Sequence, residues 1–176
     1  MLVVVRHTLY LLRHAKSSWD DPELSDRARP LAKRGRRAVA LLGEHLRETA
    51  VAPDLVLCSS AVRAVETLEG VRDGLPPGVA VEIEDDLYSA DAAALLERLR
   101  ALREAVGSVM LVGHNPELEE LAGELAGGGD PDARARVAAK YPTGGLATLA
   151  FEGTWRRLDR HDATLEAFAV PRELGR

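Results

Sequence analysis

The stretch Leu11-Leu12-Arg13-His14-Ala15-Lys16-Ser17-Ser18-Trp19-Asp20 joins an apolar run to an adjacent Arg–His pair and then to small and polar residues. Neither a guanidinium nor an imidazole fills an apolar core, and the guanidinium keeps its charge at any ordinary pH. The pattern therefore indicates a site at the mouth of a buried strand. We expect Arg13 to hold an anion there and His14 to carry out a reaction.

Outward from this stretch, short apolar runs alternate with longer segments of helical periodicity. We expect strands at 8–13, 54–58, 79–84, 109–113 and 146–151, and helices at 33–49, 61–74, 91–106 and 116–126. Three of the runs are continuously apolar, which is typical of strands covered on both faces. The alternation predicts a three-layer α/β/α sandwich with a mostly parallel central sheet.

Four segments fit this pattern less well. Residues 126–131 contain three consecutive glycines and are expected to form a flexible loop, while 155–158 fits an edge strand and 165–170 fits either a strand or a helix. The pair Arg6–His7 also follows an apolar run, but a strand sequence comes after it instead of small and hydroxyl residues. We therefore expect 1–7 to be a solvated N-terminal extension.

Length and composition limit the classes of protein that the chain can belong to. Its 176 residues predict one domain, 1–176, and apolar residues make up an ordinary 46%. A net charge of −5 argues against a general nucleic-acid partner, because phosphate backbones select basic faces. No run reaches the roughly 18 apolar residues of a membrane span, and no cleavage site follows the N-terminal run, so we expect a cytoplasmic location without a membrane partner. The single cysteine, Cys58, is expected to be a small core residue.

Three strand ends would meet if the strands are parallel, because ligands bind outside the carboxyl ends of such strands. The first end carries Arg13 and His14, the second is followed by Arg63, and another carries His114. The serines at 17, 59 and 60 add hydroxyl groups. Guanidinium forks and helix N-termini suit a phosphoryl group. A neutral histidine can attack phosphorus and form a covalent intermediate, while the other histidine stabilises charge.

At these residues the chain resembles the histidine phosphatase superfamily, the fold group of the cofactor-dependent phosphoglycerate mutases. The family's Arg-His-Gly-x-Ser-x-x-Asn motif corresponds to residues 13–20, and its Ser-rich strand end with Arg-Ala-x-x-Thr corresponds to residues 59–67. The Gly-His pair after an apolar strand corresponds to Gly113-His114. Ala15 and Asp20 depart from the first motif. The small SixA-type phosphohistidine phosphatases are similar in this respect, and the resemblance extends over about residues 8–151.

The resemblance implies a role for each motif residue. His14 would be the nucleophile of a covalent phosphohistidine mechanism, Arg13 and Arg63 would bind phosphate, and His114 would complete the pocket. Ser17 is expected to bind phosphate as well. The family's proton donor follows its third strand, and Asp86 lies nearest that position, although a solvated acidic turn is an equally good interpretation of this run.

The segment between Asp86 and His114 bears on the substrate. These two residues are separated by 28 positions, which one helix and one strand nearly fill. The mutases and sugar phosphatases of the superfamily carry an insertion here that roofs the pocket. An open pocket favours a phosphohistidine on a protein, whose N–P bond depends less on a buried acid.

Two other functions remain open at this point. One is a phosphatase or mutase that acts on a small phosphomonoester, and the other is a catalytically weak phosphate-binding module. No two histidines lie one helical turn apart with a carboxylate nearby, so we expect no metal and no cofactor. The expected partner is a phosphorylated protein or a small phosphorylated substrate.

Overall fold

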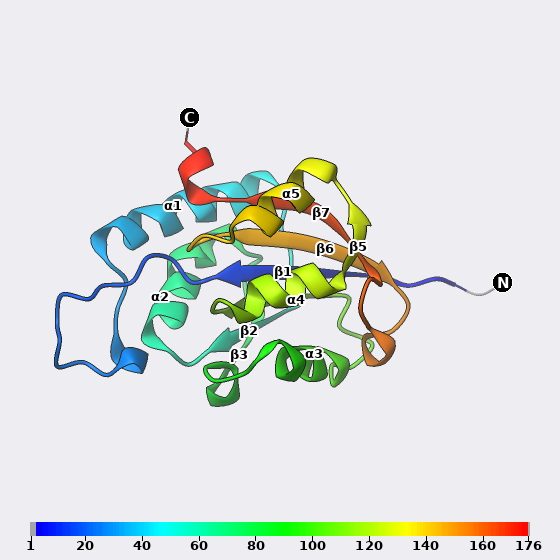
Figure 1. The fold of residues 1–176 in the computed structure, drawn as a ribbon, viewed down its shortest axis with the longest axis horizontal. Coiled ribbons are helices and arrows are strands. Elements are labelled where there is room, and N and C mark those ends of the chain that lie inside the picture. The colour runs from blue at the N-terminus through cyan, green and yellow to red at the C-terminus, as the bar shows by residue number, and fades with distance from the viewer. Residues whose placement is uncertain (1–2, 176) are drawn as a thin grey trace.

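A seven-stranded sheet runs through the centre of the computed structural model, which describes residues 3–175 (Figure 1). The strands lie in the order β3-β2-β4-β1-β6-β7-β5. Along the chain they are β1 (Arg6–Arg13), β2 (Leu55–Ser59), β3 (Ala80–Glu84), β4 (Ser108–Gly113), β5 (Ala126–Gly129), β6 (Leu146–Glu152) and β7 (Ala163–Ala169).

Helices cover both faces of the sheet, because alternate residues of the central strands point to opposite sides. Leu9 and Leu11 pack with the helices α3 (Ala92–Arg100), α4 (Glu117–Leu125) and α5 (Pro131–Ala139). Leu12 packs on the other side with α1 (Lys33–Glu48) and α2 (Val62–Val71). Figure 1 shows α4 crossing in front of β1. The predicted three-layer α/β/α sandwich is confirmed, and no helix within residues 3–175 is long and apolar enough to cross a membrane.

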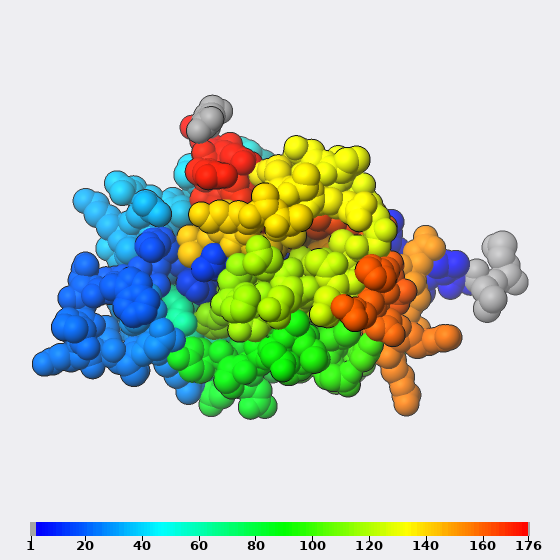
Figure 2. Space-filling view, viewed as in Figure 1, coloured from blue at the N-terminus to red at the C-terminus, as the bar shows by residue number. Residues whose placement is uncertain are grey.

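Parallel pairing brings the carboxyl ends of four strands to one edge of the sheet. β1 pairs with β4, β4 with β2 and β2 with β3, all parallel, whereas β6 runs antiparallel to β1. Arg13 at the end of β1 lies beside Gly113 at the end of β4. Beyond this edge, the chain between β1 and α1 forms the blue end of the molecule in Figure 2. The strand ends that carry the sequence motifs therefore lie side by side.

The expected loop at 126–131 is instead an edge strand followed by a helix. β5 pairs in parallel with β7, and α5 begins at Pro131. A Cβ atom on Gly127 would lie 2.0 Å from the carbonyl oxygen of His161, and one on Gly129 would lie 2.1 Å from that of Leu165. The glycines are thus required by close backbone packing, and the prediction of a flexible loop is wrong.

The structure also corrects two expectations and resolves a third. Residues Trp155–Arg157 form a 3-10 helix where an edge strand was expected, with the Trp155 indole donating to the carbonyl oxygen of Val106 at 2.6 Å. Residues 163–169 form strand β7, so the strand alternative for 165–170 holds. The expected extension over 1–7 is too long, because β1 begins at Arg6 and His7 is only 1% exposed. His7 is buried because its ring stacks on Phe151 at 5.1 Å between centroids.

Candidate active site

Two histidines face each other at the carboxyl edge of the sheet. His14 directly follows β1 and is 7% exposed, and His114 directly follows β4. Their ring centroids lie 5.2 Å apart, with an angle of 56° between the ring planes. The parallel pairing of β1 with β4 produces this arrangement, since it places the last residues of the two strands next to each other. The structure thus brings together two residues that lie 100 positions apart in the chain.

The backbone fixes the tautomer of His14. Its Nδ1 lies 2.7 Å from the carbonyl oxygen of Ala15, and a carbonyl can only accept a hydrogen bond. Nδ1 therefore carries the proton, which leaves a lone pair on Nε2. The amide of Ala15 donates in turn to Oγ1 of Thr67 in α2, at 2.9 Å. The imidazole is consequently held in an orientation that leaves one nitrogen available for attack.

Burial keeps both histidines uncharged. It lowers the pKa of His14 to about 3, and the positive charges of Arg63 and Arg13 act in the same direction. Burial also lowers the pKa of His114 to about 4, assisted by Arg63 and partly opposed by Asp26. Both imidazoles are therefore neutral at pH 7, as a nucleophilic histidine requires.

β2 orients the second imidazole. Nε2 of His114 lies 2.8 Å from Oγ of Ser59, and that hydroxyl accepts a hydrogen bond from the amide of Ala61 at 3.2 Å. The Ser59 hydroxyl can donate its proton to Nε2 of His114 while its oxygen accepts from this amide. Nδ1 of His114 is buried and has no hydrogen-bond partner within residues 3–175.

Two arginines surround the histidine pair. Nη1 of Arg13 donates to the carbonyl oxygen of Tyr141 at 2.8 Å, whereas its buried Nε has no partner in the described part of the chain. Arg63, in the first turn of α2, is 7% exposed and donates to the backbone oxygen and the carboxylate of Asp26 at 2.6 and 3.0 Å. Buried donors of this kind suit an anionic ligand with several oxygen atoms.

Asp26 and Tyr88 belong to the site but were not predicted from the sequence. The Asp26 carboxylate accepts hydrogen bonds from the Tyr88 hydroxyl at 2.7 Å, from Arg63, and from Arg29 at 2.8 Å. These donors hold the pKa of Asp26 well below its usual range. The Tyr88 ring also packs edge-on against His114, with 5.7 Å between centroids. Neither residue stands in a distinctive sequence pattern, so only the fold reveals their positions.

Two residues that the sequence placed in the site lie differently. Ser17 is buried, but its hydroxyl accepts a hydrogen bond from Arg29, and it has no hydrogen bond with either histidine. Asp86 is exposed on the 3-10 helix Asp85–Leu87, and its side chain forms no hydrogen bond or salt bridge with residues 3–175. The carboxylate that acts electrostatically on His114 is that of Asp26.

Other reactive groups lie outside this arrangement. Burial raises the pKa of the Cys58 thiol to about 12, so the thiol stays protonated and acts as a small core residue. Over residues 3–175, no group of three or more histidine, cysteine, aspartate or glutamate side chains is placed to hold a metal ion.

Known proteins share this sequence and fold. A family model of the histidine phosphatase superfamily (branch 1) matches residues 9–95. The phosphohistidine phosphatase SixA of Escherichia coli is 32% identical over 125 residues, which cover 70% of this chain and 76% of that protein. The chain belongs to the histidine phosphatase superfamily. The family match includes His14 and Arg63 and ends before His114, which the parallel pairing of β4 with β1 brings into the site.

Two further proteins extend the similarity over nearly the whole chain. An uncharacterized protein of Mycobacterium leprae is 38% identical over 165 residues, covering 92% of this chain and all of its own. A solved structure from Nakamurella multipartitia, assigned as a SixA phosphohistidine phosphatase, superposes with a TM-score of 0.82 at 29% identity. It covers 94% of this chain and 96% of its own. The histidine phosphatase fold therefore includes the C-terminal strands that the family model does not reach.

Proposed function

We propose that this histidine phosphatase hydrolyses phosphohistidine on a protein substrate through a covalent phosphohistidine formed at His14. The observation that carries the proposal is the facing pair of neutral imidazoles, 5.2 Å apart, with the charges of Arg13 and Arg63 acting on both. A covalent intermediate divides one difficult displacement into two easier ones.

In the first step, the lone pair on Nε2 of His14 attacks the phosphorus atom. The P–N bond to the substrate imidazole breaks, and the departing imidazole takes a proton from water. Arg13 and Arg63 hold the oxygens of the phosphoryl group during the transfer, since planar guanidinium groups match phosphate oxygens in pairs. In the second step, water attacks the phosphorus, the bond to His14 breaks, and inorganic phosphate leaves.

His114 stabilises the transferred group as a neutral donor. In the proposed mechanism the Ser59 hydroxyl donates to Nε2 of His114, which places the imidazole proton on Nδ1, the buried nitrogen without a partner in residues 3–175. A donor placed where charge develops contributes more in a buried site than in water. His114 thus lowers the barrier without having to be protonated.

The surroundings of the site support a protein substrate. Between Asp86 and His114 the chain forms only the end of a 3-10 helix, α3 and β4, so no inserted domain covers the histidines from this segment. The exposed position of Asp86 agrees with a leaving group that needs no buried acid. The E. coli relative described above is itself a phosphohistidine phosphatase.

Comparative kinetics test the proposal. Wild-type protein should hydrolyse a phosphohistidine peptide with a higher kcat/KM than sugar phosphates, and a chelator should not change the rate. His14→Ala should abolish both turnover and acid-labile phosphoryl labelling of the protein. A clear preference for sugar phosphates would show that the substrate is a small phosphomonoester, and full activity of His14→Ala would exclude His14 as the nucleophile.

A further inference from the structure

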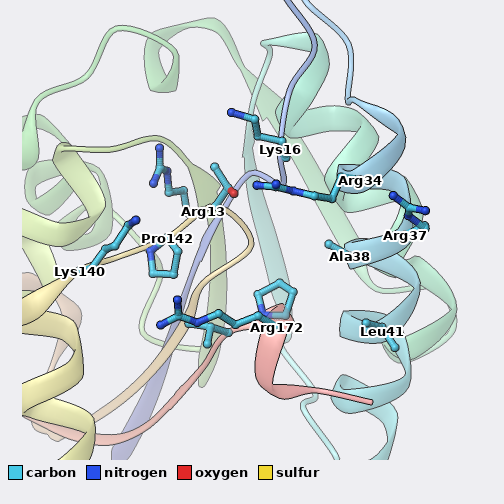
Figure 3. A pocket seen from close by; sticks show the side chains of 12 residues that line it. Arg13, Lys16, Arg34, Arg37, Ala38, Leu41, Lys140, Pro142 and Arg172 are labelled. Atoms are coloured by element: carbon cyan, nitrogen blue, oxygen red, sulfur yellow. The ribbon is translucent and has the colours of Figure 1, made fainter. Parts of the chain in front are cut away.

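A groove of about 770 Å³ opens beside the active site and shares Arg13 with it (Figure 3). One wall is a single face of α1, because residues 34, 37, 38 and 41 recur at helical spacing. Lys140, Pro142 and Thr143 form the opposite wall, and residues 170–172 close one end. Figure 3 shows Arg34 extending from α1 toward the middle of this space, with Lys140 and Pro142 across from it. We call this space the basic groove.

The basic groove concentrates positive charge on a protein whose net charge is −5. Half of its lining residues are cationic and none is acidic; the cations are Arg13, Lys16, Arg34, Arg37, Lys140 and Arg172. None of these six forms a salt bridge with residues 3–175, whereas several other arginines have carboxylate partners, as Arg136 has in Asp132 and Glu173. A cluster of cations without salt-bridge partners attracts an anionic partner and guides it toward Arg13.

The construction of the groove favours a chain segment over a small polyanion. A site for a small molecule fixes its ligand with a few buried and well-placed polar groups. Here every cation except Arg13 is exposed on a long flexible side chain. Leu41, Val170 and Pro171 add apolar surface between the charges. Acidic side chains of a docked segment could pair with these exposed cations, while its apolar side chains cover the apolar surface between them.

We propose that the basic groove docks an acidic segment of the phosphoprotein substrate and thereby presents the phosphohistidine to His14. This inference rests on the proposed function, because it assigns the charge of the protein that the site acts on. Arg13 links the two regions, since it lines the groove and acts electrostatically on His14.

Two synthetic peptides provide the test. Each carries one phosphohistidine, made with phosphoramidate, in either a glutamate-rich or a glutamine-rich sequence of equal length. Wild-type protein should show at least tenfold higher kcat/KM on the acidic peptide, and this preference should decline as salt is added. The triple variant Arg34→Gln/Arg37→Gln/Arg172→Gln should lose about tenfold on the acidic peptide, because each exposed pair contributes only modestly. It should stay within twofold of wild type on an aryl phosphate.

A matched control separates docking from a general change of charge. Arg103→Gln/Arg156→Gln/Arg157→Gln removes three exposed arginines that lie outside the basic groove. The side chains in both triple variants make no hydrogen bond within residues 3–175, so both proteins should keep their fold. The control should retain the full preference for the acidic peptide. An equal loss in the control would overturn the proposal.

Direct binding distinguishes failure of docking from failure of the proposed function. Fluorescence anisotropy of the unphosphorylated acidic peptide requires no turnover, and its affinity should fall about tenfold in the groove variant but not in the control. If neither phosphohistidine peptide is hydrolysed while this binding persists, the proposed substrate is wrong and docking stands. Equal binding of acidic and glutamine-rich peptides would overturn the docking proposal. The docking proposal would also be overturned if the groove variant bound inorganic tripolyphosphate more weakly but bound the peptides as wild type does. The groove would then accept a small polyanion.

Discussion

At the scale of single residues, the proposed mechanism requires His14 to be uncharged when it attacks phosphorus. The pKa of this imidazole is lowered to about 3 by burial, so the neutral form dominates far below the ordinary histidine range. After correction for ionisation of the substrate, kcat/KM on an aryl phosphate should stay flat from pH 7 to pH 5 and fall below about pH 4, as His114 and then His14 take up protons. A pH–rate profile with a midpoint near 6.5 would show that His14 titrates as an exposed histidine.

Asp26 positions Arg63 and is the second residue whose role can be measured. Its carboxylate and backbone oxygen hold two nitrogens of the Arg63 guanidinium. Asp26→Asn keeps the size of the side chain and removes its charge, and we expect kcat/KM to fall about tenfold. The loss should be smaller than for a fully buried charge-assisted hydrogen bond, because the Asp26 side chain is half exposed.

Tyr88→Phe provides the control for this prediction. It removes the hydroxyl that donates to Asp26 but leaves the Asp26–Arg63 ion pair and the aromatic ring beside His114. Its kcat/KM should decrease less than that of Asp26→Asn in parallel assays. Equal rates for Asp26→Asn and wild type would show that Arg63 does not need this partner.

At the scale of elements, the first turn of α1 packs directly against the chain that follows β1. A Cβ atom added to Gly35 would lie 2.1 Å from the backbone oxygen of Lys16, which also accepts a hydrogen bond from Ala32 at 2.8 Å. Gly35→Ala should therefore displace this segment, lower stability by about 1–3 kcal/mol and reduce kcat/KM at least tenfold. Urea unfolding and steady-state kinetics on the same samples would measure both effects.

Gly123 in α4 is a suitable comparison for Gly35. A Cβ atom there would meet nothing within 4 Å, so Gly123→Ala should gain about 0.5–1 kcal/mol from better helix propensity and leave turnover unchanged. If Gly35→Ala behaves in the same way, the close contact between α1 and Lys16 does not constrain the site.

Tyr141 connects β1 to β6 through its buried hydroxyl. The hydroxyl donates to the carbonyl oxygen of Leu11 at 2.5 Å and accepts from the amide of Ala147 at 3.2 Å. Tyr141→Phe leaves both backbone groups buried without this partner, and we expect unfolding to become easier by about 1–3 kcal/mol in chemical denaturation. The backbone oxygen that accepts from Arg13 remains, so kcat on an aryl phosphate should change less than stability does. An unchanged unfolding midpoint would contradict this role.

At the scale of the whole molecule, the sequence predicted the layers and the core of the site because both depend on local patterns. Continuous apolar runs indicated buried parallel strands, and such strands must bring His14 and His114 to one edge. The glycines of β5 were misread because composition does not report that the carbonyl oxygen of Leu165 lies beside Gly129. Asp26 was missed because its role depends on the chain between β1 and α1 folding over α2.

The two buried histidines together should make the folded protein less stable in acid. An unfolded histidine binds a proton near pH 6.5, whereas folding lowers the pKa of His14 to about 3 and that of His114 to about 4. The unfolded state therefore binds more protons between these values, so the stability that is fully present above pH 6.5 is lost as the pH falls toward 3–4. For His14 the loss should reach about 2 kcal/mol by pH 5. Chemical denaturation at a series of pH values should show a smaller loss of unfolding free energy for His14→Asn than for wild type. Equal losses in the two proteins would contradict a lowered pKa of His14.

The central position of β1 also determines when this site can exist during synthesis. The first strand to be made has its neighbours in β4 and β6, where Thr8 lies opposite Ser108 and Ala150. Most of the chain must therefore leave the ribosome before β4 and β6 can pair with β1 and place His114 beside His14. Until then both edges of β1 lack their partner strands and its apolar side chains stay exposed, so an unfinished chain cannot bring His14 and His114 together.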